Sequence, residues 1–347
     1  MTSGEPPLES RTGNQFPEPG SHPGGNGSTS TCCGTPRDLM SPKVSTPSGR
    51  DGPASAVPCP PPGDHRKDAI WFPGGPAFVG TDRPLIRADG EGPCRRVRLK
   101  AFGLDRIAVT NARFATFVEA TGYVTDAERL GWSYVFHLLL RQPDRHPAPP
   151  GIPWWRGVEG ASWRSPEGPG SGIDGREDHP AIHISWNDAS AFAGWCGGRL
   201  PREAEWEHAA RGGQRDPRYP WGDEEPDDAR IFCNIWQGRF PLNNTGADGW
   251  LATAPVQSFE PNSYGFYNMV GNVWEWCADP FRVHALSREA RARDKAARAD
   301  AERLQKGGSY LCHASYCHRY RIAARMGRSA DTSSGHSGFR VAWDPGA

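Results

Sequence analysis

Hydrophobic and polar positions divide this chain into a polar N-terminal stretch and a longer part in which short apolar runs alternate with turns. Glycine and proline occupy 23 of the first 66 positions. Burying the few large apolar side chains there would contribute at most ~20 kcal/mol. Ordering 66 backbone residues would cost on the order of 66–130 kcal/mol. The pattern therefore predicts a disordered tail over residues 1–66 and a single domain over 67–347. The large apolar side chains of the tail are Leu8, Phe16, Leu39, Met40, Val44 and Val57.

Helical periodicity with capping signals occurs in three places. The first predicted helix follows Thr110 as N-cap, carries apolar residues at helical spacing and ends at Gly122. The second covers residues 186–196, where Ser185 and Asp188 have the spacing of a capping box. A third is expected to begin at Pro201, with Glu203 and Glu205 in its first turn, and to end at residues 212–213.

The other apolar runs are short and predict strands separated by turns. Residues 70–79 predict a β-hairpin that turns at the two glycines 74–75, and the last forty residues predict glycine-bounded strands. Residues 141–180 are rich in proline and glycine and are expected to be irregular. The charged, alanine-rich residues 283–305 predict either a solvated helix or a flexible excursion. A few helices among many unalternated strands indicate the α+β class.

Charge and composition exclude several classes of function. Lysine plus arginine equals aspartate plus glutamate at 40 each, so no global charge favours nucleic acid or acidic membranes. No apolar run approaches the ~18 residues that span a bilayer. The N-terminus lacks the basic and hydrophobic regions of a secretory signal, so a cytoplasmic location is expected. In that compartment most of the nine cysteines should be free thiols.

The densest group of chemically active residues lies between Lys306 and Arg325. Cys312 and Cys317 lie five positions apart there, among histidines, tyrosines and arginines. Two nearby thiols can be a disulfide, a redox couple, half of a zinc site or a two-coordinate site for a soft ion. Zinc is disfavoured because a structural zinc site usually needs four ligands, whereas two sulfurs satisfy Cu(I). Neighbouring lysine and arginine would favour the thiolates. Incidental core cysteines and a disulfide remain open on these residues alone.

This segment, KGGSYLCHASYCHRYRIAAR, resembles the active-site loop of the formylglycine-generating enzymes, also called sulfatase-modifying factors. Similar blocks are HPAIHISWNDA at 179–189, RLPREAEWEHAARGG at 199–213, GNVWEWC at 271–277 and SSGHSGFRVA at 333–342. The resemblance covers about residues 70–342. It implies a variant of the C-type-lectin fold, α+β with little regular secondary structure. It also implies a copper-dependent oxidase that converts the cysteine of a sulfatase Cys-x-Pro-x-Arg motif into formylglycine, with O2 as acceptor.

The resemblance assigns roles to five residues near the thiols. Cys312 and Cys317 would be the thiolate ligands of Cu(I), and the substrate cysteine would add a third sulfur. Ser309 would lie beside the oxygen site, Trp274 would form a wall of that pocket, and Tyr316 matches an active-site tyrosine. Hydrogen abstraction at the substrate Cβ would give a thioaldehyde that water converts, with external thiols supplying electrons. A core role for Trp274 and a strand-end hydroxyl for Ser309 are the alternatives.

Two structural calcium sites are implied by the same resemblance. Oxygen ligands of mixed side-chain and backbone origin suit a hard cation, although asparagine and aspartate also stabilise turns. The first set comprises the side chains of Asn234 and Asp248 and the carbonyls of Ile235 and Trp250. The second comprises the side chains of Asn268 and Glu275 and the carbonyls of Gly271 and Val273.

Substrate recognition requires an unfolded sulfatase polypeptide, since a thiol inside a folded protein could not become a copper ligand. The irregular stretch 141–180, with Trp154 and Trp155, is long enough to form one wall of a groove that binds this polypeptide. The alternative is that both tryptophan rings are anchors in the hydrophobic core. Arg319 and Arg321 are expected to be structural. A monomer is expected, with O2 and a thiol reductant as co-substrates.

Two other functions are compatible with parts of the pattern. A catalytically silent, lectin-like binding module could share the fold, but it would have no reason to keep both thiols. Iron-dependent sulfoxide synthases share this domain as well, but they carry an additional helical domain with an iron-binding histidine motif, which this tail lacks. Residues 279–281 (Asp-Pro-Phe) and 326–330 (MGRSA) depart from the family pattern.

Overall fold

The computed structural model describes residues 65–284 and 287–346. The predicted tail lies outside the described residues except for its last two positions. The ring of His65 lies 5.1 Å from that of Trp195, and the guanidinium of Arg66 lies 5.6 Å from the ring of Trp343. Both residues therefore pack against the described part of the chain.

Short strands, five α-helices and long turns make up the described residues, in agreement with the predicted α+β class. The strands are β1 (Ala69–Phe72), β2 (Gly75–Val79), β3 (Arg95–Leu99), β4 (Phe102–Asp105), β5 (Trp132–Phe136), β6 (Trp155–Glu159), β7 (Gly238–Arg239), β8 (Asn243–Asn244), β9 (Trp274–Pro280), β10 (Arg303–Lys306), β11 (Met326–Arg328), β12 (Ser337–Gly338) and β13 (Ala342–Trp343). The helices are α1 (Asn111–Thr121), α2 (Asp126–Leu130), α3 (Trp186–Trp195), α4 (Glu203–Ala210) and α5 (Arg288–Ala299), with 3-10 turns η2 (Arg87–Asp89), η3 (His137–Leu139) and η4 (Pro143–Arg145).

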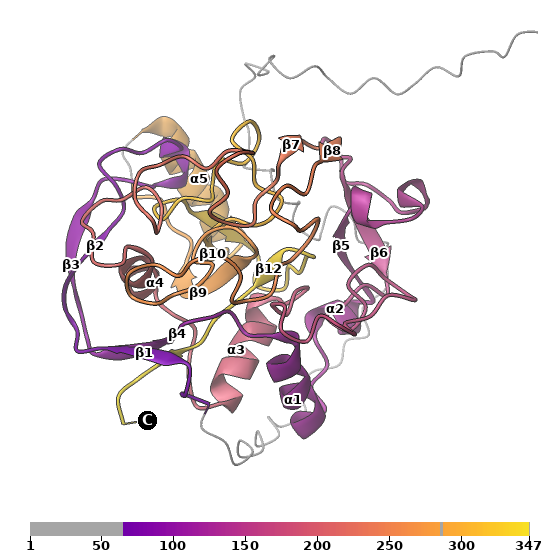
Figure 1. The fold of residues 1–347 in the computed structure, drawn as a ribbon, viewed down its shortest axis with the longest axis horizontal. Helices are drawn as coiled ribbons and strands as arrows, with labels where there is room; N and C mark the ends of the chain where they lie inside the picture. The colour runs from indigo at the N-terminus through magenta and orange to yellow at the C-terminus, as the bar shows by residue number, and fades with distance from the viewer. Residues whose placement is uncertain (1–64, 285–286, 347) are drawn as a thin grey trace, which may run out of the picture. The chain divides into compact units, whose positions relative to one another are not determined.

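A four-stranded sheet of order β11-β10-β9-β12 lies at the centre of the fold (Figure 1). Its strands pair antiparallel except for β12, which runs parallel to β9. A second sheet of order β1-β4-β13 joins segments from both ends of the described chain. Three two-stranded ribbons are also present among the described residues, β2–β3, β5–β6 and β7–β8. The thiol segment thus lies between two strands of the central sheet, β10 and β11.

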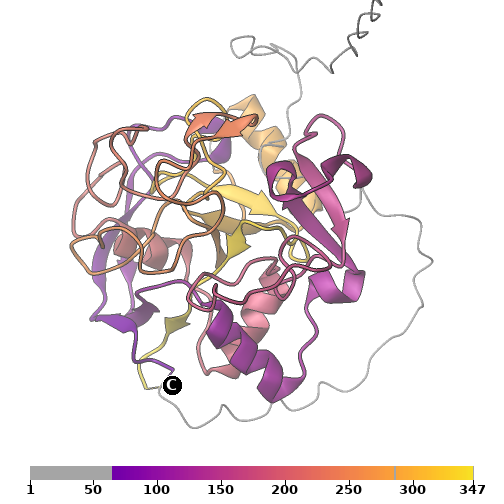
Figure 2. The ribbon, with the colours of Figure 1, turned by 45° about the vertical axis from the view of Figure 1, so that its right-hand side comes forward.

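Two of the predicted helices are confirmed with their caps. Thr110 Oγ1 accepts a hydrogen bond from Arg113 N (3.2 Å), and Gly122 ends α1 in the left-handed region at φ +66°. Ser185 and Asp188 form the predicted capping box of α3. The two helices lie side by side (Figures 1 and 2), where Phe114 and Phe192 stack with ring centroids 5.9 Å apart. No helix in the described part of the chain is both long and apolar enough to cross a bilayer.

The predicted hairpin over residues 70–79 is wrong. β1 pairs with β4 and β2 pairs with β3, so the strands flanking Gly74 belong to different sheets. Gly74 has φ +82°, and a Cβ on it would lie 2.7 Å from the carbonyl carbon of Lys100. The two glycines therefore carry the chain from one sheet to the next where another backbone segment passes closely, and they do not reverse it.

Three further elements refine the prediction. The third helix begins at Glu203 rather than Pro201, with Glu205 accepting a hydrogen bond from the backbone N–H of Arg202 (2.8 Å). The short helix α2, capped reciprocally by Thr125 and Glu128, was not predicted. Within 283–305 the solvated-helix alternative is correct, because α5 buries only Ala290 and Ala297. Residues 141–180 are irregular apart from η4 and β6, as expected.

Candidate active site

Cys312 and Cys317 lie together in the turn-rich loop between β10 and β11. The backbone N–H of Cys317 donates to His313 O (2.8 Å), which folds the loop back and brings the two sulfurs to 3.2 Å. Neither cysteine is in a disulfide, and each is 1% exposed. A disulfide would need about 2.05 Å between the sulfurs. The structure therefore shows a buried pair of thiols, which is the donor set that a soft cation prefers.

The structure brings Ser309 and Trp274 together with the thiol pair. The Ser309 N–H donates to Cys312 Sγ (3.4 Å), and its hydroxyl accepts from Leu311 N (3.3 Å). Trp274 is fully buried in the hydrophobic cluster that contains both cysteines. Its indole N–H is buried and finds no acceptor among the described residues. Trp274 thus combines a core position with an unused donor.

Tyr316 belongs to an aromatic group beside the thiols. Its ring stacks on Phe240, with centroids 4.2 Å apart and an interplanar angle of 12°. Trp154 stands edge-on to both rings. With Trp155 and His336, these side chains line a cavity of about 10 Å³, which is room for one water at most. The predicted groove residues Trp154 and Trp155 therefore line a cavity beside the thiol loop, and this cavity is nearly closed in the structure.

Among the two predicted groove tryptophans, the environments differ. Trp155 is 1% exposed and belongs to β6, within a cluster that includes Phe136 and Trp236. Trp154 is only partly buried and packs against that cluster from outside. Trp155 is therefore a core residue, whereas Trp154 keeps part of its ring surface exposed.

His336 is a site residue that the sequence reasoning did not single out. It is 1% exposed, its Nδ1 lies 2.8 Å from Ser334 Oγ, and its Nε2 is buried without a partner in the described part of the chain. Burial lowers the pKa of this imidazole to about 3. His336 is therefore neutral, faces the small cavity, and offers one uncommitted nitrogen there. The only signal in the sequence was a histidine inside SSGHSGFRVA, a block used for the resemblance alone.

The basic residues around the thiols are bonded to buried carboxylates. As expected, Arg319 and Arg321 are structural. The sequence-based idea that neighbouring cations favour the thiolates gains no support, because these charges are already neutralised. The pairs are Lys306–Glu207 (2.8 Å), Arg319–Asp89 (2.6 Å), Arg321–Glu91 (2.5 Å) and Arg325–Glu203 (2.5 Å).

The first predicted calcium set contains two buried oxygens that lack donors. Asn234 Oδ1 and Asp248 Oδ2 have no hydrogen-bond partner among residues 65–284 and 287–346. The other carboxylate oxygen of Asp248 accepts from Trp250 N (2.9 Å), and the backbone of Ile235 also bonds this carboxylate. Burial raises the pKa of Asp248, an effect that a bound cation would oppose by favouring the charged form. The two side-chain oxygens without donors would suit a hard cation, whereas Ile235 and Trp250 meet the Asp248 carboxylate through their backbone N–H groups.

The second predicted calcium set fits a cation less well. Asn268 Oδ1 is buried without a donor from the described residues, at a backbone φ of +48°. The carboxylate of Glu275, however, accepts from Arg340 Nη2 (2.6 Å) and Trp206 Nε1 (2.7 Å). Arg340 thus already neutralises Glu275, the one charged ligand of this set. The other predicted ligands of the set are the backbone carbonyls of Gly271 and Val273. Within the described residues no three His, Cys, Asp or Glu side chains gather as a metal cluster.

Comparison with protein families matches residues 55–345 to the model of the sulfatase-modifying factor enzyme 1-like domain. The formylglycine-generating enzyme of Thermomonospora curvata is 53% identical over 285 residues, covering 80% of this chain and 94% of that protein. The enzyme of the same name from Streptomyces coelicolor is 56% identical, covering 74% of this chain and 82% of its own length.

A relative named inactive C-alpha-formylglycine-generating enzyme 2, from Bos taurus, is 43% identical over 79% of this chain and 87% of its own length. Membership of the family alone therefore does not establish activity. Among solved structures, PvdO from Pseudomonas aeruginosa has a TM-score of 0.55 at 24% identity, covering 80% of this chain and 95% of PvdO. At that identity the likeness concerns the fold alone. Together with the family match, it confirms the predicted fold class.

Proposed function

The chain belongs to the sulfatase-modifying factor family, and from that premise we propose that it is a formylglycine-generating oxidase. Its substrate would be the cysteine of a Cys-x-Pro-x-Arg motif in an unfolded sulfatase polypeptide. The observation that carries the proposal is the buried pair of thiols, Cys312 and Cys317, with sulfurs 3.2 Å apart and no disulfide between them. A non-catalytic member of the family would not need this pair.

The two thiolates are proposed to hold one Cu(I) ion. Copper bound there would supply the activation of O2 and a place for the sulfur of the substrate. The chain contributes the donor geometry: the His313 carbonyl folds the loop, and the Ser309 N–H orients Cys312 Sγ. Trp274 and the surrounding apolar cluster exclude water from the sulfurs, which protects a reactive site from side reactions.

Substrate positioning is assigned to Trp154 and Tyr316. Their rings, with Phe240, surround the small cavity next to the thiol loop. Binding of the polypeptide would open this space and hold the reacting Cβ near the sulfurs, which converts an encounter into an intramolecular step. The arginine of the motif would find carboxylate or carbonyl partners, since Arg319 and Arg321 are committed to ion pairs.

The proposed reaction balances with two external thiols. One substrate thiol, one O2 and two reductant thiols give the aldehyde, hydrogen sulfide, one disulfide and one water. A Cβ–H bond and the Cβ–S bond of the substrate break, and a C=O bond forms. The substrate supplies two electrons and the external thiols supply the other two that O2 requires. The proposal includes a monomeric, cytoplasmic enzyme.

Calcium is proposed as a structural ion at the first set, around Asn234 and Asp248. The unsatisfied oxygens of both residues support it. The loop that carries this set is tied to the thiol loop, because Trp236 N donates to Cys312 O (3.0 Å). A cation there would stabilise the backbone that positions the thiols.

Mass spectrometry of a Cys-x-Pro-x-Arg peptide tests the proposal. The peptide is incubated with the protein, copper and a thiol in air. We expect conversion of the cysteine to formylglycine, trapped with a hydroxylamine, in wild type but not in Cys312→Ser or Cys317→Ser. Cys94→Ser, outside the thiol loop, is the matched control and should remain active. Full conversion by either loop mutant would refute the assignment, and absence of conversion by wild type would favour the silent binding module.

A further inference from the structure

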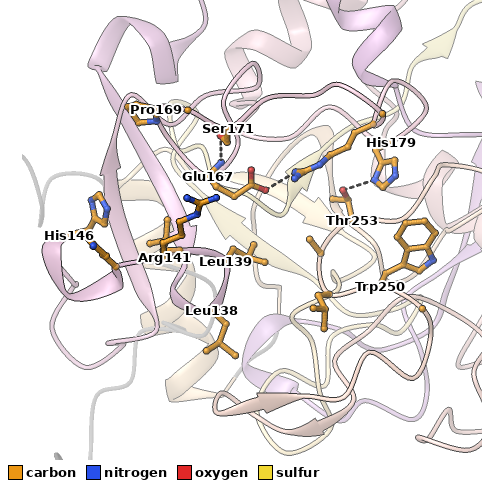
Figure 3. A pocket seen from close by; sticks show the side chains of 18 residues that line it. Leu138, Leu139, Arg141, His146, Glu167, Pro169, Ser171, His179, Trp250 and Thr253 are labelled. Atoms are coloured by element: carbon orange, nitrogen blue, oxygen red, sulfur yellow. Dashed lines mark hydrogen bonds and ion pairs between the residues drawn. The ribbon is translucent and has the colours of Figure 1, made fainter.

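A large open cavity lies beside the candidate active site and has no role in the mechanism above. Its volume is about 1070 Å³. Three segments far apart in the sequence surround it, residues 138–146, 167–179 and 249–253 (Figure 3). Cavities of this size suit drug-sized ligands or several residues of a peptide.

Polar side chains on two walls of the cavity are held in place by bonds to one another. Arg176 pairs with Glu167 (2.6 Å), whose backbone N–H donates to Ser171 Oγ (3.0 Å). On the neighbouring wall, His179 Nδ1 lies 3.0 Å from Thr253 Oγ1 (Figure 3). A ligand would therefore meet a preorganised surface, which lowers the entropic cost of binding.

The cavity also presents apolar groups and an excess of positive charge. Leu138 is 48% exposed and Leu251 is 59% exposed, so aliphatic surface faces solvent at this place. Trp250 adds an indole that packs edge-on against His179, with centroids 5.4 Å apart. Because Arg176 neutralises Glu167, the exposed Arg141 leaves the lining with a net positive charge. The complementary ligand carries an aliphatic group and a carboxylate.

One segment forms a wall of both cavities. Phe136 lines the small cavity at the thiol loop, and Leu138 and Leu139 line the large one. Between them, His137 N donates to Trp154 O (2.8 Å), and His137 Nε2 lies 3.0 Å from Pro241 O. This double attachment fixes the shared wall. An extended polypeptide that fills the small cavity is thereby brought next to the large one.

We propose that the large cavity is an exosite for the sulfatase polypeptide. It would bind a segment outside the Cys-x-Pro-x-Arg motif, with an aliphatic side chain against Leu138, Trp250 and Leu251 and an acidic side chain beside Arg141. The inference rests on the proposed function for the identity of its ligand. Its physical role is to hold an unfolded chain at a second point, which raises the effective concentration of the cysteine at the thiols.

Two peptides separate the exosite from the reaction site. The short peptide contains the motif with minimal flanks, and the long one adds a flanking segment that carries leucine and aspartate. Conversion kinetics are measured for wild type, Arg141→Glu and Leu251→Asp. Arg98→Glu and Leu85→Asp change exposed residues outside the cavity and serve as matched controls. Binding is measured independently by fluorescence anisotropy of labelled peptides in which serine replaces the reacting cysteine.

The expected result is a rise of about fivefold in KM and Kd for the long peptide in Arg141→Glu, as for loss of one favourable charge contact. The short peptide should be unaffected, and a long peptide with lysine in place of aspartate should recover affinity for Arg141→Glu. Equal effects on both peptides, or no effect on the long one, would overturn the exosite. Failure of wild type to convert either peptide would instead refute the proposed function, while the anisotropy data would still decide on the exosite.

Discussion

The indole ring of Trp154 stands perpendicular to the phenol ring of Tyr316, at an interplanar angle of 90° with centroids 5.1 Å apart. The neighbouring Trp155 points into the core and is 1% exposed. Two adjacent tryptophans therefore have different physical roles. One can change its contacts when a ligand enters, and the other cannot move without opening a cavity in the core.

Alanine at each of the two positions should separate binding from stability. For Trp154→Ala we expect a severalfold higher KM for a short motif peptide, with little change in Tm. For Trp155→Ala we expect a loss of about 3–5 kcal/mol in the free energy of unfolding, because a large buried ring is removed. Peptide kinetics and urea denaturation of both variants measure this. A Trp154→Ala variant with unchanged KM and a large loss of stability would contradict the division.

Copper binding should depend on both thiols equally. Two sulfurs 3.2 Å apart offer one two-coordinate site, so we expect one Cu(I) per chain by competition with a chromophoric chelator. Serine at Cys312 or Cys317 should weaken binding by more than about a hundredfold, since one thiolate is lost outright. Cys196→Ser, also buried but outside the cluster of the thiols, should bind as wild type does. Retained affinity in either loop mutant would exclude the pair as the copper site.

Calcium removal should lower thermal stability through the oxygens of Asn234 and Asp248. A ligand present at a hundred times its Kd stabilises the folded state by about 2.7 kcal/mol, which corresponds to about 5–10 °C in Tm for a domain of this size. Chelation should therefore shift the Tm of wild type by this amount. Asp248→Asn should melt at the lower temperature with or without calcium. Asp144→Asn, whose side chain is 94% exposed, should behave as wild type. Identical wild-type melting curves with calcium and with chelator would refute a structural calcium ion at this set.

Acid should destabilise the fold through Glu203. Burial alone would raise the pKa of this carboxyl, but Arg325 and Lys306 outweigh that effect and lower it to about 2. Because the folded pKa lies below the unfolded value, the contribution is fully present above pH ~4.5 and is lost as the pH falls towards about 2. It amounts to about 3 kcal/mol.

Glutamine at position 203 tests this pH dependence. Glu203→Gln should cost about 3–5 kcal/mol at neutral pH, since it leaves a buried guanidinium without its partner. It should also flatten the dependence of unfolding free energy on pH between about 2 and 4.5. The exposed Glu119→Gln is the control. Equal acid slopes for wild type and Glu203→Gln, measured by urea denaturation, would show that this carboxylate is not responsible.

Elements with local signals were predictable from the sequence. The caps of α1 and α3 follow from residues within one turn of the helix ends, so Thr110 and Ser185 mark real starts. The box of Thr125 and Glu128 carried the same information for α2, but the five-residue helix lacks an apolar period to draw attention to it. The two glycines at 74 and 75 led to the wrong prediction of a hairpin, because paired glycines are equally suited to a hairpin turn and to a crossing between two sheets. Only the distant partners of β1 and β2 distinguish the two.

In the candidate site too, features set by local sequence were predictable and features set by distant contacts were not. The Cys-x4-Cys spacing brings both sulfurs into one turn, so the thiol pair could be predicted. The partners of the basic residues could not be predicted, because Asp89 and Glu91 lie 230 positions before Arg319 and Arg321. Glu275 was assigned to calcium by resemblance, whereas its carboxylate bonds Arg340 and Trp206. The place of His336 beside the small cavity depends on its burial, which the sequence pattern around it does not reveal.

The sheet β1-β4-β13 has a consequence for how the protein is made. β4 pairs with β1 along one edge and with Ala342 and Trp343 of β13 along the other. The Trp343 indole N–H also donates to Asp105 Oδ1 (2.7 Å). A chain emerging from the ribosome therefore holds an unpaired strand edge from residue 105 until residue 343 has cleared the exit tunnel. Strand pairing over such a separation is slow, and exposed edges invite aggregation in the meantime. The soluble yield of this protein should accordingly depend on translation rate and chaperone supply.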